Sequence, residues 1–317
     1  MAERILMILA AMVVMAIIAA VIAAWRNPVT LFYWKDRRAL ANAGFAKTLI
    51  ASAVGEQCVW EKGFGPTLIF LHGLGDHAGS WARVAPSFTP NYRVVIPDLA
   101  GHEESEPKTG TLHMGAVLAG VDAVVRARAG DSPIIFVGNS LGAWSAIVYA
   151  HQHPERVARI IATGGGPLRG EWEEVLSKPR TREDMQKLLD LVVDPGSPHA
   201  ARFVVDDLLR HAQRGPMARF AESGIAELEG TLLEGRLGEV KTPVDLIWGE
   251  SDRLVPLKFA RRMQKQLSAV RLTTIPHCGH IPQQECPKAY SSALRQVLLQ
   301  APPLPSDAPS RVKEEQA

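Results

Sequence analysis

The chain has 317 residues, enough for one large domain with additional segments at its ends. Its formal net charge is +2, so the composition gives no reason to expect a nucleic-acid partner. Three cysteines in a chain of this length do not make a disulfide framework, and we expect Cys58, Cys278 and Cys286 to be reduced thiols or small core residues.

An apolar segment opens the chain. Residues 5–25 carry no charge and consist almost wholly of Ile, Leu, Met, Val and Ala. About 20 such residues span the hydrocarbon core of a bilayer as a helix, whereas the apolar region of a cleaved signal is usually about 7–15 residues long. We therefore predict an uncleaved transmembrane anchor at residues 1–26, with a secretory signal peptide as the alternative.

Positive charge follows this segment more than it precedes it. Arg26, Lys35, Arg37 and Arg38 come after it, whereas Arg4 before it is offset by an acidic neighbour. The positive-inside rule then places the rest of the chain on the cytoplasmic side, or outside the cytoplasm if the segment is cleaved. We expect residues 27–54 to be a juxtamembrane linker.

The first buried strand is predicted at residues 67–71, and it ends in the turn His72-Gly73-Leu74-Gly75. A flexible turn at a strand end can aim a backbone N–H at a reacting carbonyl group. We predict that the N–H of Leu74 is one donor of such an oxyanion hole. His72 itself is expected to pack beneath the loop and not to transfer protons.

The strongest signal is the pentapeptide Gly138-Asn139-Ser140-Leu141-Gly142, which follows the apolar run 134–137 and precedes a predicted helix at 141–153. A G-x-S-x-G sequence between a strand and a helix forms a tight turn that exposes the serine at the end of a sheet. The glycines avoid Cβ clashes where the helix crosses the strand. We predict that Ser140 is a nucleophile and that the Leu141 N–H is the second oxyanion donor.

A long helical segment follows the strand that ends near Thr163. Apolar residues recur in it at spacings of three and four, as in Met185, Leu188 and Val192. Several prolines divide it into short pieces. We predict a helical cap at about residues 167–236.

Two further buried strands are predicted at residues 244–249 and 270–275. The first is followed by Glu250 and Asp252, and the second by His277 and His280. A serine hydroxyl becomes a good nucleophile only when a base takes its proton, and an acid must orient that base. From position alone, either carboxylate could reach a histidine.

The order of these segments resembles the α/β-hydrolase fold superfamily of the esterase and lipase type, over about residues 55–299. Its members carry serine, acid and histidine in this order, each after a strand. Residues 248–256 match the family's W-G-x-x-D-x-x-x-P pattern, and residues 279–287 match its G-H-x-x-x-x-E-x-P ending. The resemblance implies that Asp252 is the acid and His280 is the base.

One segment departs from the family pattern. Residues 98–105 resemble D-x-x-G-H-G-x-S, but Glu103 replaces the second glycine. The resemblance implies that Asp98 and His102 fix the loop and are not catalysts. The conformation of the turn at Glu103 is left open.

The resemblance implies a mostly parallel sheet with helices on both faces, a helical cap, and an active site at the carboxyl ends of the strands. It also implies a serine hydrolase that cleaves carboxylic esters through an acyl-enzyme, without a cofactor or a metal. With the N-terminal anchor, the architecture resembles monoacylglycerol lipases, so lipid esters are the expected substrates. Alternatives are a C–C bond, amide or lactone hydrolase with the same triad, an acyltransferase, and a non-catalytic membrane-tethered binding protein. Residues 300–317, Pro-rich and then charged, are predicted to be disordered.

Overall fold

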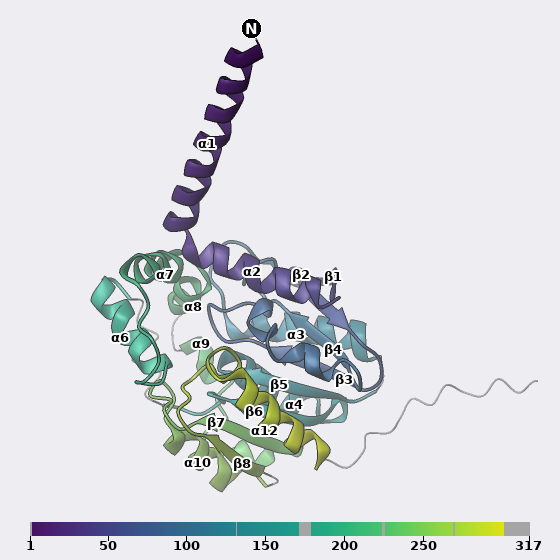
Figure 1. Ribbon diagram of the computed structural model, residues 1–317. Coiled ribbons are helices and arrows are strands. Elements are labelled where there is room, and N and C mark those ends of the chain that lie inside the picture. Colours follow the sequence, from purple (N-terminus) through teal and green to yellow (C-terminus); the bar gives the residue numbers. More distant parts are fainter. Residues whose placement is uncertain (1, 131, 171–178, 224–225, 269, 301–317) are drawn as a thin grey trace, which may run out of the picture.

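A computed structural model describes residues 2–130, 132–170, 179–223, 226–268 and 270–300. The predicted disordered tail from residue 301 onward lies outside the described residues, as do residues 171–178 and 224–225 of the predicted cap. The remaining elements are labelled in Figure 1.

The core of the molecule is one eight-stranded sheet in the order β1-β2-β4-β3-β5-β6-β7-β8. The strands are β1 (Ala46–Ser52), β2 (Gly55–Lys62), β3 (Thr67–Leu71), β4 (Arg93–Pro97), β5 (Ile134–Asn139), β6 (Val157–Thr163), β7 (Val244–Gly249) and β8 (Val270–Ile275). β2 pairs antiparallel with β1 and with β4, and all other neighbours are parallel. The predicted mostly parallel sheet is confirmed, and every strand predicted from the sequence belongs to it.

Helices cover both faces of this sheet because its central strands are apolar on both sides. Successive residues of a strand point to opposite faces. Accordingly Ile69 and Leu71 pack with α3 (Met114–Ala129), α4 (Leu141–Gln152) and α10 (Leu257–Gln266), whereas Leu68 and Phe70 pack with the short helices η1 (Ala78–Trp81) and η2 (Ala85–Phe88) and with α12 (Pro287–Leu299).

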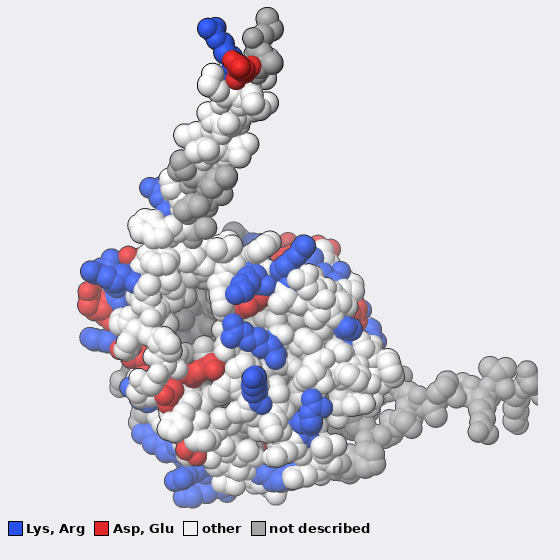
Figure 2. Space-filling model, in the orientation of Figure 1, with Lys and Arg blue, Asp and Glu red and all other residues white. Residues whose placement is uncertain are grey.

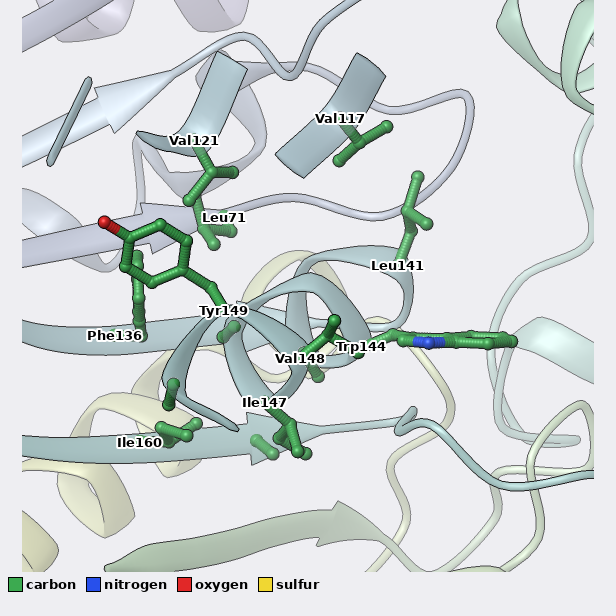
Figure 3. Close-up of a cluster of buried hydrophobic side chains, with 14 of the residues drawn as sticks. Leu71, Val117, Val121, Phe136, Leu141, Trp144, Ile147, Val148, Tyr149 and Ile160 are labelled. Carbon is green, nitrogen blue, oxygen red and sulfur yellow. The ribbon is translucent and has the colours of Figure 1, made fainter. Parts of the chain in front are cut away.

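The helix that follows the predicted nucleophile is the most deeply buried of those described. Figure 3 shows its Tyr149, Val148 and Ile147 among side chains of β5, β6 and α3. The rings of Tyr149 and Phe136 meet edge to face with centroids 5.8 Å apart, an arrangement that aromatic pairs favour. Close packing of α4 on the sheet fixes the position of the turn that precedes it.

Four helices occupy the described part of the predicted cap: α6 (Arg182–Val192), α7 (Arg202–Arg214), α8 (Pro216–Ser223) and α9 (Ala226–Glu229). α6 begins with a capping box in which Thr181 and Asp184 satisfy each other's backbone N–H groups. In Figure 1 the cap lies beside the sheet, next to the base of α1.

Two helices precede the sheet. α1 (Ala2–Arg26) projects from the body of the molecule, and α2 (Pro28–Asn42) lies along it (Figure 1). Of the helices in the described part of the chain, none is long and apolar enough to cross a membrane, so the prediction of a transmembrane anchor finds no support here. Residues 27–54 are not a simple linker, because they form α2 and the edge strand β1.

Candidate active site

Ser140 sits in a strained turn between β5 and α4. Its backbone has φ 54° and ψ −114°, a conformation that is costly for a residue with a side chain. The turn is held in place because the Ser140 N–H donates to the carbonyl of Thr163 on β6, at 2.8 Å. Strain at this position is the mark of a nucleophile elbow, which holds the serine hydroxyl clear of the sheet.

The two glycines of the pentapeptide are required by space. A Cβ on Gly138 would lie 2.6 Å from the backbone nitrogen of Ala143, and a Cβ on Gly142 would lie 2.3 Å from the carbonyl oxygen of Leu71. Neither backbone atom can move without displacing α4 or β3. The close crossing inferred from the sequence is therefore present.

The predicted acid and base meet in the structure. His280 Nδ1 lies 2.9 Å from Asp252 Oδ2, and both residues are buried. The other oxygen, Asp252 Oδ1, accepts hydrogen bonds from the N–H groups of Leu254 and Val255 at 3.0 and 2.8 Å. These two bonds fix the carboxylate, which then fixes the imidazole ring.

The rival residues lie elsewhere. Glu250 is exposed, and its carboxylate accepts a hydrogen bond from Thr274 Oγ1 at 2.7 Å. His277 is also exposed, in a turn where its φ is 53°. The geometry thus favours Asp252 over Glu250 and His280 over His277, as the family patterns implied.

The loop after β3 lies beside Ser140, the predicted nucleophile. Gly73, Leu74 and Gly75 line the same cavity as Ser140, Leu141 and His280. The Gly75 N–H donates to His102 Nε2 at 3.1 Å, and His72 Nδ1 lies 2.8 Å from the Gly73 carbonyl oxygen. Leu74 therefore lies in the cavity wall beside Ser140, and its role as an oxyanion donor stays a prediction.

The histidines around this loop are structural. Burial lowers the pKa of His102 to about 4 and holds the pKa of His72 well below its usual value, so both rings are neutral at pH 7. Asp98 Oδ1 accepts from the Ala78 N–H at 2.7 Å. Glu103 adopts the left-handed φ of 38° that the family's glycine would adopt easily, and its carboxylate pairs with Arg37.

Asn139 is a residue of the site that the sequence analysis did not identify. It is fully buried, and its Nδ2 donates to the carbonyl oxygen of His280 at 2.9 Å while its Oδ1 accepts from Gln283 at 3.1 Å. Asn139 therefore holds the backbone of His280, the predicted base. The position of Asn139 next to Ser140 in the pentapeptide was the sequence feature that could have indicated a role in the site.

The glycine run after β6 also has a role that was missed. A Cβ on Gly165 would lie 2.5 Å from the carbonyl oxygen of Ser140, and a Cβ on Gly164 would lie 3.0 Å from the His280 ring. Glycine is needed here because the chain passes directly against Ser140 and His280. The three residues 164–166 line the cavity as a result.

The cavity has a volume of about 600 Å³ and is mostly apolar. Its walls come from the core, from the cap helices and from α2, including Val29, Leu188, Leu208, Met217 and Phe259. Figure 2 shows the surface hollowed below the base of α1, between the cap and α2. An apolar group fits such a lining better than a charged one.

Charge around this cavity is sparse. Among the lining residues in the described part of the chain there is no Lys or Arg. Asp76 is the acidic residue among them. Burial raises the pKa of Asp76 to about 7, and its Oδ2 accepts from Gln284 Nε2 at 3.0 Å. No group of three or more His, Cys, Asp or Glu in the described residues is placed to hold a metal ion.

The expectation that all three cysteines are reduced is wrong. Cys278 and Cys286 form a disulfide, and their Cα atoms are 6.2 Å apart. The bond closes a loop that carries His280, and within that loop the Gly279 N–H donates to Glu285 Oε2 at 2.6 Å. Only Cys58, buried in the core, is a free thiol. The eight-residue separation lay within one loop, but a count of cysteines could not show that the two meet in space.

We expect replacement of both Cys278 and Cys286 by serine to lower the free energy of unfolding by about 2–4 kcal/mol, because the bond limits the freedom of the unfolded chain. Denaturant unfolding of the two proteins measures this difference. In addition, iodoacetamide should alkylate one cysteine of the denatured wild type without reductant and three with it. Alkylation of all three without reductant would contradict the disulfide.

Residues 68–293 match the sequence model described as the Alpha/beta hydrolase family. A 2-hydroxy-6-oxo-6-phenylhexa-2,4-dienoate hydrolase of Burkholderia cepacia is 28% identical over 257 residues, which cover 73% of this chain and 87% of the relative. A pimeloyl-(acyl-carrier protein) methyl ester esterase of Nitrosomonas europaea is 31% identical over 249 residues, which cover 73% of this chain and 94% of the relative.

Among solved structures, the chain is similar to one described as a membrane phospholipase A, a novel bacterial virulence factor. The TM-score is 0.73 and the sequence identity is 26%. The match covers 92% of this chain and 97% of the other, so it includes more of the chain than the family segment does.

Proposed function

Because the chain belongs to the α/β-hydrolase family and is a serine hydrolase, we propose that it cleaves carboxylic esters that carry a long apolar chain, such as monoacylglycerols or other lipid esters. The observation that carries this proposal is the lining of the cavity. Ser140 and His280 open into a space of about 600 Å³ whose other walls are chiefly aliphatic and aromatic. The relative named as a methyl ester esterase and the structure named as a membrane phospholipase A agree with an ester substrate.

The proposed chemistry assigns one role to each of these groups. His280 takes the proton of the Ser140 hydroxyl as its oxygen attacks the ester carbonyl, and Asp252 holds the imidazole in the required tautomer. The N–H groups of Leu74 and Leu141 stabilise the negative charge that forms on the carbonyl oxygen. His280 then gives the proton to the leaving alcohol. Water, deprotonated by His280, cleaves the acyl-enzyme and releases the acid.

Cleavage of a C–C bond is the second candidate, because a relative is named as a dienoate hydrolase. A dienoate is a carboxylate, and burying its charge is costly without a cation. The described lining of the cavity offers no Lys or Arg and includes the carboxyl of Asp76. The charge distribution therefore favours neutral esters over such acids.

We also propose that α1 contacts a lipid phase. All eleven residues from Ile5 to Met15 are exposed to solvent. Leu6 is 69% exposed and Met7 is 65% exposed. On the face shown in Figure 2, the charged side chains of the described part of α1 lie near its two ends. Exposed apolar surface of this extent marks an interaction site. The cavity opening below α1 would then receive substrate directly from that phase.

The disulfide bears on which side of a membrane the hydrolase domain occupies. Disulfides persist in oxidising compartments and are rare in the cytosol. The bond between Cys278 and Cys286 therefore supports a location outside the cytoplasm, against the cytoplasmic side predicted from the flanking charges. We propose that the hydrolase domain lies outside the cytoplasm.

The test is turnover of three substrates by the full chain: a soluble short-chain ester, a long-chain monoacylglycerol in neutral lipid vesicles, and a phenyl-substituted hydroxy-oxo-dienoate. We expect kcat/KM for the long-chain ester to exceed that for the short one by at least about tenfold, because each buried CH₂ contributes about 0.8 kcal/mol. A preference for the short ester, or faster cleavage of the dienoate, would overturn the proposed substrate.

A variant of α1 separates lipid contact from chemistry. We expect Leu6→Ser, Leu9→Ser, Met12→Ser and Val13→Ser together to lower turnover in vesicles at least about tenfold, since burying one such side chain contributes about 1.5–3 kcal/mol. Hydrolysis of the soluble ester should stay within about twofold, because none of these residues lines the cavity. Equal loss on both substrates would count against the lipid role of α1.

A further inference from the structure

The helix α2 lies outside the segment that matches the family, yet it forms part of the active-site wall. The family match begins at residue 68, whereas α2 ends at Asn42. Pro28, Val29, Phe32 and Tyr33 of this helix line the cavity together with Ser140. The site is therefore completed by a segment that lies outside the family-matched residues.

The first turn of α2 is fixed to the cap. The Val29 N–H donates to Asp207 Oδ2 at 2.9 Å, and the Asp207 carboxylate is buried at the N-terminus of α2, where negative charge is favourable. Arg210 donates to Asp207 Oδ1 at 2.9 Å and to the carbonyl oxygen of Arg26 at 2.6 Å. Trp25 stacks on Phe203 with ring centroids 5.9 Å apart. These contacts hold α2 at one place over the cavity.

Tyr33 extends from α2 to the loop after β3. Its hydroxyl donates to the carbonyl oxygen of Gly75 at 3.0 Å, and its ring lies 4.0 Å from the ring of His77, centroid to centroid. Burial raises the pKa of Tyr33 above its usual value, so the hydroxyl keeps its proton and remains a donor. Asp36 of the same helix also faces His77, with Asp36 Oδ2 3.8 Å from His77 Nε2.

The loop that Tyr33 reaches is flexible by composition. It contains Gly73 and Gly75, and Gly75 has φ +75°. The peptide group that carries the Leu74 N–H is held at the Gly73 carbonyl oxygen, which accepts from the Asp76 N–H at 3.2 Å and lies 2.8 Å from His72 Nδ1. The Gly75 N–H is held on one side by His102 Nε2 at 3.1 Å. Its carbonyl is held on the other side by Tyr33, so the peptide groups on either side of Gly75 are fixed from two directions.

We propose that Tyr33 is a positioning residue of the oxyanion hole: its hydrogen bond to the Gly75 carbonyl holds the loop so that the Leu74 N–H stays aimed at the reacting carbonyl group. This inference rests on the proposed function, because it assigns a role to Leu74 in that reaction. Through Tyr33, a helix that precedes the hydrolase domain sets the geometry of the catalytic loop. A peptide group misplaced by about 1 Å is enough to cost a large factor in rate.

The test is Tyr33→Phe in the full chain, with Tyr149→Phe as the matched control. Both changes remove one phenol hydroxyl, and that of Tyr149 contacts Asp122 at 3.1 Å, away from the cavity. Losing a whole oxyanion donor costs about 10²–10³ in kcat, so a loosened one should cost about tenfold. We expect Tyr33→Phe to lower kcat about tenfold on a soluble ester with KM within about twofold, and Tyr149→Phe to leave both within about twofold.

A trifluoromethyl ketone inhibitor provides the readout that a purely structural role would not move. Its adduct with Ser140 carries an oxyanion, so its affinity should fall with Tyr33→Phe by about the same factor as kcat/KM, while the affinity of a non-reactive ether analogue of the ester, which has no carbonyl group, stays constant. A lower melting temperature with kcat and inhibitor affinity unchanged would overturn the proposal. If the wild type reacts with a fluorophosphonate but Tyr33→Phe equals it in every assay, this inference alone fails. If the folded wild type neither reacts nor hydrolyses esters, the proposed function fails with it.

Discussion

Replacing Ser140 by alanine is expected to abolish ester hydrolysis and labelling by a fluorophosphonate. In the proposed mechanism the hydroxyl oxygen forms the acyl-enzyme, and removal of a catalytic serine lowers kcat by about 10⁶. The fold should survive, because alanine tolerates the φ of 54° no worse than serine does and no hydrogen bond from the side chain supports the turn. Mass mapping of the labelled protein, together with steady-state hydrolysis, measures the result.

Ser145→Ala is the matched control. Ser145 lies in the same helix α4 and is fully buried, and its hydroxyl donates to the carbonyl oxygen of Gly142 at 3.1 Å. Ser145→Ala also removes one hydroxyl group close to the turn, but Ser145 does not line the cavity. Labelling and turnover of Ser145→Ala should stay within about threefold of the wild type. Persistent labelling of folded Ser140→Ala would show that another residue is the nucleophile.

Strands, and turns defined by short motifs, could be predicted from the sequence because their determinants are local. The run at residues 134–137 is apolar throughout, which by itself predicts a buried strand. The glycines of the next turn are required where α4 crosses the strands, within a few residues of the same segment. The prediction that Ser140 is the nucleophile therefore rests on the residues themselves. The choice of Asp252 and His280 required the family patterns in addition, because Glu250 and His277 follow the same two strands just as closely in sequence.

What escaped prediction depends on contacts between distant segments. The hydrogen bonds from Asn139 to His280 and from Tyr33 to Gly75 join residues 141 and 42 positions apart. A sequence pattern states which face a side chain occupies in its own element, but not which residue of another element it meets. For the same reason, residues 27–54 could not be recognised as part of the fold, because α2 and β1 are defined by what they pack against.

Asp252→Asn is expected to lower kcat by about 10⁴ with little change in KM. Asp252 Oδ1 accepts hydrogen bonds from Leu254 and Val255, so the amide oxygen of the asparagine must take that place and its NH₂ must face His280 Nδ1. The imidazole then accepts at Nδ1 and carries its proton on Nε2. In that tautomer it cannot take the proton of Ser140, and the equivalent change in a Ser-His-Asp triad costs about 10⁴ in kcat. Steady-state hydrolysis and the rate of fluorophosphonate labelling should fall together.

Glu250→Gln distinguishes the two carboxylates that the sequence left as rivals. The Glu250 side chain is exposed and bound to Thr274 on β8, so its loss should change kcat by less than about twofold. The two variants differ from the wild type by the same replacement of a carboxylate by an amide, two positions apart. If Glu250→Gln lost activity while Asp252→Asn kept it, the bond of 2.9 Å between Asp252 and His280 would have no catalytic meaning. Loss confined to Asp252→Asn, with KM unchanged, assigns the orienting role to Asp252 because only a group that acts in the transition state lowers kcat alone.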